Sequence, residues 1–148
     1  MPVRKVARDI IISAALLVCS SCAQSTAAQF SGRWMFDVER TISMDATLQQ
    51  KIKEDPRIRA QLHKVREQAS FHVFSQNGAT LIETNDGNGK VKRLRYVVVT
   101  EELGQLVIDT RNVTSNDVRR MIISFFGANN MEVYLPVQNK RIAFIRED

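Results

Sequence analysis

The chain has 148 residues, 44% of them hydrophobic and 25% charged, which is enough for one compact domain and leaves little room for two. Three prolines and six glycines in this composition exclude a fibrous or a disordered chain. The total charge is +5; the first 21 residues carry +2 of it, which leaves +3 on the remainder. That excess is too small to indicate nucleic acid or a strongly anionic surface as the partner.

The amino-terminal segment has the pattern of an export signal. A short basic stretch with Arg4, Lys5 and Arg8 precedes the uncharged, mostly apolar run 10–18. This run is too short to cross a bilayer core, which needs roughly 20 helical residues. Small polar residues follow it at once, so we interpret residues 1–21 as a signal for export.

Both cysteines of the chain, Cys19 and Cys22, lie at the end of this leader, so the exported part cannot form an intramolecular disulfide. The segment 18–23, Val-Cys-Ser-Ser-Cys-Ala, resembles the lipobox of bacterial lipoproteins, in which a cysteine after small residues is acylated. The resemblance implies lipidation at Cys22 and, with Ala23 behind it, an outer-membrane lipoprotein facing the periplasm. The alternative is cleavage among the small residues 25–28, which predicts a soluble periplasmic product.

The segment after the leader changes character at Phe30. Residues 22–29 are small and polar without periodicity, which predicts a tether, so the folded domain is expected over 30–148. From Phe30 to about residue 40, apolar and polar residues alternate. A period of two with one apolar face predicts a half-buried first strand over 30–40.

Two short helices are expected over 45–68. Asp45 is a candidate cap for the first, and Asp55, followed by a proline, for the second. Apolar residues recur at helical spacing behind each cap, and the basic residues between them form a solvated face. Because the chain is expected to be exported, a helix-turn-helix that binds nucleic acid is not expected here.

The remainder predicts an antiparallel meander. Short apolar runs are separated by turn sequences at hairpin spacing, which brings the total to eight strands joined mainly by tight turns. The expected strands after the first are 71–75, 80–83, 91–100, 105–110, 119–126, 131–135 and 141–146. The segment 115–126 also fits helical spacing, and we favour a strand because Ile122-Ile123 and Phe125-Phe126 suit a pleated surface. The fold class is therefore mainly β, with a helical pair inserted between strands one and two.

This arrangement resembles the calycins, the class of lipocalins and fatty-acid-binding proteins. Phe30-Ser31-Gly32-Arg33-Trp34 resembles the Gly-x-Trp signature of their first strand, and small bacterial lipoproteins with a lipocalin-like domain share the layout. The resemblance implies a barrel, complete or partly open, closed at one end by Gly32 and Trp34. It also implies that Arg146 of the last strand stacks on that indole by a cation–π contact.

The same resemblance implies a ligand cavity under a helical lid, holding a small apolar or amphipathic molecule. The residues expected to line it are Phe36, Leu62, Val65, Phe71, Tyr96 and Phe144. The alternative for each is ordinary core packing. For the whole protein, the alternative is a structural or interaction module of the envelope with an unknown protein partner and no ligand.

The sequence shows no catalytic constellation. The two histidines, His63 and His72, cannot supply a closed zinc site, so neither a metal nor another cofactor is expected. The run Asp86-Gly87-Asn88-Gly89 has the turn residues of a hairpin, and Val97 stands where a calcium loop needs its bidentate glutamate. No nucleophile motif or phosphate loop is present, so we do not predict an enzyme.

Overall fold

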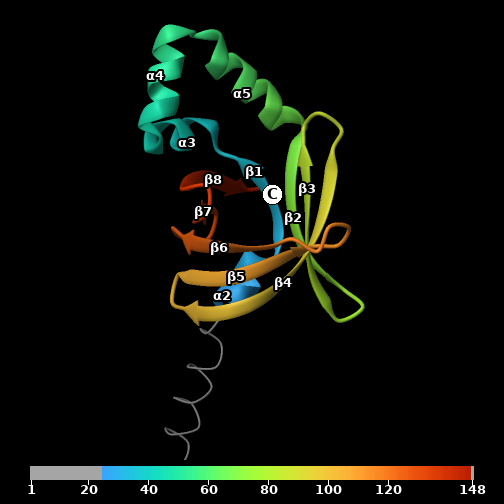
Figure 1. Ribbon diagram of the computed structural model, residues 1–148. Coiled ribbons are helices and arrows are strands. Elements are labelled where there is room, and N and C mark those ends of the chain that lie inside the picture. Colours follow the sequence, from blue (N-terminus) through green and yellow to red (C-terminus); the bar gives the residue numbers. More distant parts are fainter. Residues whose placement is uncertain (1–24, 148) are drawn as a thin grey trace, which may run out of the picture.

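The computed structural model describes residues 25–147 and shows a β-barrel with helices at both ends (Figure 1). The strands are β1 (Gly32–Phe36), β2 (Ala69–Gln76), β3 (Ala79–Asp86), β4 (Val91–Glu102), β5 (Gln105–Asn112), β6 (Val118–Phe125), β7 (Asn130–Leu135) and β8 (Lys140–Arg146). The helices are α2 (Thr26–Phe30), α3 (Val38–Met44), α4 (Ala46–Glu54) and α5 (Arg57–Gln68).

The eight strands form one closed antiparallel barrel in sequence order. Each strand pairs with the next, and β1 closes the ring by pairing with β8, where Trp34 lies opposite Arg146 and Phe36 opposite Phe144. This confirms the predicted fold class, a mainly β, calycin-like up-and-down meander with helices between the first two strands. The uncertain segment 115–126 contains strand β6, which pairs with both β5 and β7.

The first strand is shorter than predicted, because the alternating pattern from Phe30 to Val38 passes through three elements. Phe30 is the last residue of α2, and Val38 is the first residue of α3. Both are fully buried, as is Trp34 on the strand between them, so their spacing imitates one long strand. Asp37 ends the strand by capping α3, since its carboxylate accepts a hydrogen bond from the Arg40 N–H at 3.1 Å.

The predicted tether is also corrected, because its last residues belong to the fold. From Thr26 the chain is helical, and the Thr26 hydroxyl donates a hydrogen bond to the Glu102 carbonyl at 2.8 Å. Helix α2 thereby lies against β4 at the end of the barrel opposite the other helices (Figure 1). The leader, Cys22 and the start of the tether lie outside the described residues.

The helical segment between β1 and β2 has three helices where two were expected. As predicted, Asp45 caps α4, accepting from the Leu48 N–H at 2.9 Å. The next helix begins at Arg57, and the Asp55 carboxylate accepts the Arg57 N–H at 3.1 Å. Helix α3 was not expected, because its seven residues were assigned partly to the first strand.

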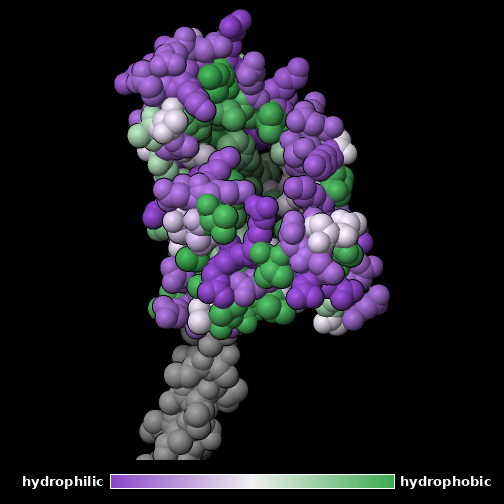
Figure 2. All heavy atoms as spheres, viewed as in Figure 1, coloured by the Kyte–Doolittle hydropathy of each residue, from purple (hydrophilic) through white to green (hydrophobic). Residues whose placement is uncertain are grey.

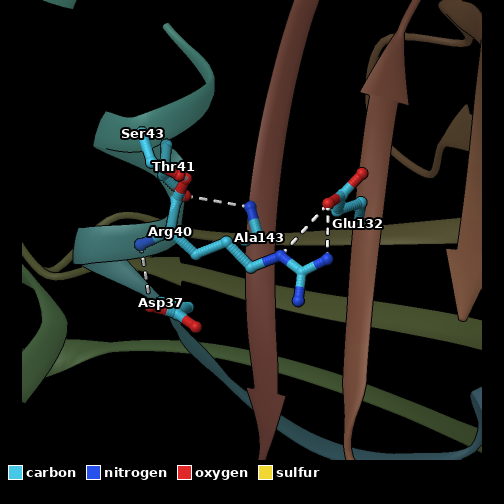
Figure 3. A network of polar contacts seen from close by, with 6 residues as sticks. All are labelled: Asp37, Arg40, Thr41, Ser43, Glu132 and Ala143. Atoms are coloured by element: carbon cyan, nitrogen blue, oxygen red, sulfur yellow. Dashed lines mark hydrogen bonds and ion pairs between the residues drawn. The ribbon is translucent and has the colours of Figure 1, made fainter. Parts of the chain in front are cut away.

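Helix α3 continues the pairing that β1 begins along β8. The Asp37 N–H donates to the Ala143 carbonyl at 2.8 Å, and the Ala143 N–H donates to the buried Thr41 hydroxyl at 2.9 Å. On the next strand, the Arg40 guanidinium forms an ion pair with Glu132 at 2.8 Å (Figure 3). These contacts attach the first helix of the lid to the outside of β7 and β8.

We predict that Thr41→Val weakens this attachment. The substitution keeps the volume of the side chain but leaves the Ala143 N–H buried without an acceptor, which costs about 1–3 kcal/mol of unfolding free energy. Thr41→Ser, which keeps the hydroxyl, is the matched control and is expected to lose less unfolding free energy. Urea denaturation of both variants measures the difference, and equal losses would contradict a role for the hydrogen bond.

Candidate ligand-binding cavity

One end of the barrel is sealed around a tryptophan. Trp34 is 1% exposed, and its indole N–H donates to the Phe30 carbonyl at 3.0 Å. The Phe30 ring packs edge-on against Tyr96, with ring centroids 5.5 Å apart, and burial raises the pKa of that tyrosine. The aromatic cluster fills the barrel interior between α2 and Trp34.

Arg146 covers the tryptophan at the sealed end of the barrel. Its guanidinium carbon lies 4.2 Å from the centre of the indole ring, which is the stacking geometry that the resemblance implied. The same guanidinium donates to the carbonyls of Gln29, Ser31 (2.8 Å) and Ala128 (3.2 Å). One side chain therefore joins the start of β1, the end of α2 and the turn between β6 and β7.

Gly32 is required by this arrangement for two reasons. Its φ is +127°, a conformation that residues with a side chain rarely adopt. A Cβ atom built there would lie 2.7 Å from the Arg146 Nη1 atom, so a side chain would displace the guanidinium. The glycine of the Gly-x-Trp pattern thus makes space for the arginine that stacks on the tryptophan.

The other half of the barrel is hollow. An apolar chamber of about 440 Å³ lies above Trp34, within the range of roughly 300–1,000 Å³ that is typical of small-molecule sites. Its walls are predominantly apolar and aromatic, and they include Phe36, Phe71, Met121, Val133, Leu135, Ile142 and Phe144. Figure 2 shows this side of the molecule hollowed below the helices, with hydrophobic residues around the opening.

The helical lid covers the chamber incompletely. Helices α4 and α5 contain no buried residue, and the apolar side chains at helical spacing are only partly covered. Val65 of α5 lines the chamber, whereas Leu62 lines a smaller adjoining space of about 250 Å³ with Phe36 and Ile142. The apolar side chains of the lid therefore form part of the cavity wall. They are not fully covered by other side chains of the protein.

A polar contact joins two helices of the lid on the outside. His63 Nε2 on α5 lies 2.8 Å from the Glu39 carboxylate on α3, with Arg59 at 3.5 Å. The hydrogen bond with His63 and the charge of Arg59 lower the pKa of Glu39. Since these side chains are largely exposed, the contact orients the lid and adds little stability.

A second, polar space opens beside the chamber at the same end of the barrel. It has a volume of about 450 Å³ and shares Thr84, Met121 and Leu135 with the apolar chamber. Its other walls include Lys92, Thr110, Asn112, Asp117 and Arg119. The open end of the barrel is thus a mouth in which an apolar interior meets polar and charged side chains.

Most of the predicted cavity residues meet in this region. Phe36, Val65, Phe71 and Phe144 line the apolar chamber, and Leu62 lines the adjoining space. Tyr96 does not, because it lies further down the barrel, where it packs against Phe30 in the sealed half. The alternation of β4 showed that Tyr96 points inward, but alternation alone does not distinguish the filled part of a barrel from the hollow part.

Several wall residues were not predicted, although alternation in the sequence indicates them. Met121, Val133, Leu135 and Ile142 each lie two residues from another inward-facing side chain on the same strand. Lys92 and Arg119 also point inward, because they lie two residues before the inward-facing Leu94 and Met121. Neither cation was predicted as a wall residue, because charged residues usually lie on solvated faces.

Among residues 25–147, no group of three or more histidine, cysteine or acidic side chains is placed to hold a metal ion. In the same range, no helix is long and apolar enough to span a bilayer. The side chains at the mouth and in the chamber offer apolar contact, hydrogen bonding and charged groups, with Lys92 and Arg119 beside the carboxylate of Asp117. Compared with known proteins, the chain matches no family model, no curated protein and no solved structure.

Proposed function

We propose that this chain is an exported protein of lipocalin-like type that binds one small apolar or amphipathic molecule in the barrel. The observation that carries the proposal is the apolar chamber of about 440 Å³, open beneath helices whose apolar faces are only partly covered. Burying a ligand there removes apolar surface of both lid and ligand from water, which favours binding.

The export and anchoring parts of the proposal rest on the leader. The basic stretch and the short apolar run support export, and the lipobox-like segment supports acylation at Cys22 and the outer membrane. Helix α2 begins only four residues after that cysteine and lies at the sealed end of the barrel. An anchor at Cys22 would therefore leave the mouth and lid at the opposite end, away from the membrane.

The binding proposal is tested with N-phenyl-1-naphthylamine, a neutral probe that fluoresces in apolar surroundings. We expect saturable binding at one site and at least about tenfold weaker binding by Leu135→Trp, because the indole fills space that both cavities share. Tyr134→Trp, on the outward face of the same strand, is the matched control and is expected to bind as the wild type does. Equal binding by both variants, or no saturable binding at all, would contradict the proposal.

A second candidate is an interaction module of the envelope without a ligand. The observation that favours it is a run of exposed apolar residues in the second half of β4. Val97 is 64% exposed, and Val98 and Val99 are each 43% exposed. The pairing of β4 with β3 ends at Arg95, so among residues 25–147 no strand pairs with the β3-side edge of this apolar stretch. The probe experiment separates the two candidates, because a module without a ligand gives no saturable fluorescence.

A further inference from the structure

Three basic side chains face the mouth of the barrel from the inside. Lys92, Arg119 and Lys140 lie two residues before Leu94, Met121 and Ile142, and side chains two apart on a strand share a face. Lys92 and Arg119 line the polar space, and Lys140 lines the apolar chamber and the space under the lid. They come from β4, β6 and β8, which are alternate strands around the ring.

Two outward-facing cations of these strands have acidic partners, whereas Arg95 and Arg141 form no ion pair within residues 25–147. On β4, Arg93 forms an ion pair with Glu83 at 2.7 Å, and on β6, Arg120 forms one with Asp109 at 2.9 Å. Within residues 25–147, the charged groups of the three inward cations form no ion pair and no hydrogen bond; the one side-chain bond at these residues goes from the Thr110 hydroxyl to the Arg119 carbonyl. Their charges are available to a ligand.

Three carboxylates lie near these cations. Asp45 lines the space under the lid with Lys140, and its side chain is fixed as the cap of α4, where it accepts the Leu48 N–H at 2.9 Å. An oxygen of Asp86 accepts the backbone N–H groups of Asn88 and Lys90, at 2.8 and 3.2 Å, which fixes that carboxylate in the turn between β3 and β4. Asp117 is the third, and it lines the polar space together with Lys92 and Arg119. Because the other two carboxylates are held by a helix cap and a turn, three cations against Asp117 leave an excess of positive charge at the mouth.

The position of this charge relative to the chamber determines what kind of ligand fits. Thr84, Met121 and Leu135 line both spaces, so a chain lying in the apolar chamber ends beside the cationic mouth. A charged headgroup buried deeper would meet no described polar partner among the aromatic walls and would be costly. At the mouth it keeps access to water and gains the attraction of the cations.

We propose that the ligand is an anionic amphiphile, with one apolar chain in the chamber and a carboxylate or phosphate headgroup held by Lys92, Arg119 and Lys140. This rests on the proposed function and specifies its ligand class. Lysine and arginine suit both headgroups, as point charge and as planar donor respectively. The two sources, a fatty acid and a phosphorylated alkyl lipid, share this chemistry.

Competition against the neutral probe tests the proposal with dodecanoate, dodecyl phosphate and dodecanol, which share one chain length. An exposed ion pair contributes about two- to threefold in affinity, so three predict roughly tenfold tighter binding of an anion than of dodecanol. The preference is expected to decline as salt is added. The better of the two anions identifies the headgroup source.

The variants compare charges on the two faces of the barrel wall. The inward triple variant Lys92→Gln, Arg119→Gln, Lys140→Gln is expected to lose the preference for anions while still binding dodecanol. Its matched control, Arg95→Gln, Arg111→Gln, Arg141→Gln, removes the same charge from outward positions and is expected to keep the preference. If the inward triple variant fails to fold, Arg119→Gln alone replaces it. This single variant is expected to lower the preference for anions over dodecanol about two- to threefold.

The outcomes separate this inference from the proposed function. Dodecanol binding as tightly as both anions, or an equal loss of preference in both triple variants, overturns the anionic assignment while the cavity function stands. If neither the probe nor any of the three dodecyl compounds binds, the proposed function itself fails.

Discussion

Trp34→Ala is expected to lower the free energy of unfolding by about 3–5 kcal/mol, the range for removing a large aromatic side chain from a core. The indole is 1% exposed, donates to the Phe30 carbonyl and packs against Phe125 with ring centroids 6.1 Å apart. Its loss also removes the ring on which the Arg146 guanidinium stacks. Thermal and urea denaturation measure the effect.

The control for this variant is Trp34→Phe, which keeps an aromatic ring beneath the guanidinium and loses the indole N–H. We expect it to cost clearly less than the alanine variant, because most of the buried apolar surface remains. A Trp34→Ala protein within about 1 kcal/mol of the wild type would show that the tryptophan does not close the barrel.

Phe30→Ala is expected to lower the free energy of unfolding by a similar amount, about 3–5 kcal/mol. Phe30 is fully buried at the end of α2 and contacts the rings of Phe71, Tyr96 and Phe125, with centroid distances between 5.5 and 6.4 Å. Truncating it leaves a cavity in the sealed half and removes the contact by which α2 enters the core. Urea denaturation followed by tyrosine and tryptophan fluorescence gives the change.

Phe126→Ala is the matched control, since it changes the same residue type at a site that is 46% exposed. The Phe126 ring contacts the Arg40 guanidinium at 4.6 Å, so a small loss is expected. If the two phenylalanine variants lose equal stability, α2 does not seal the barrel in the way described.

The number and direction of the strands could be predicted because their turns are short and carry residues that favour hairpins. Asn77 and Gly78 between β2 and β3 both have positive φ, as a two-residue hairpin with a type I′ turn requires. The β6 segment was ambiguous in sequence, because its apolar residues fit both periods. Pairing with both neighbours decides it, and such pairing lies outside any local pattern.

The ends of the first strand could not be predicted from alternation. Phe30 and Val38 have the parity of Trp34, yet one ends a helix and the other begins one. Burial alone produces the pattern, whatever the backbone conformation. The capping carboxylate of Asp37 was the available signal for α3, and it was assigned to the polar face of the strand instead.

The sequence predicts which side chains point into the barrel, but it does not predict the volume of the cavity. Parity shows that Phe36, Phe71 and Phe144 point inward, as the structure confirms. Whether inward side chains fill a barrel depends on the sum of their volumes across eight strands, and Tyr96 and Phe30 together fill one half while the other stays open. The local pattern of one strand does not give the summed volume of the side chains from all eight strands.

The hollow half of the barrel is the central claim, and the most direct measurement is a crystal structure of the protein with a bromine-tagged dodecanol. The account predicts one strong anomalous bromine signal inside the barrel, among the chamber walls formed by Phe36, Phe71, Ile142 and Phe144. A chamber filled by its own side chains, with the bromine only on the outer surface or absent, would contradict it.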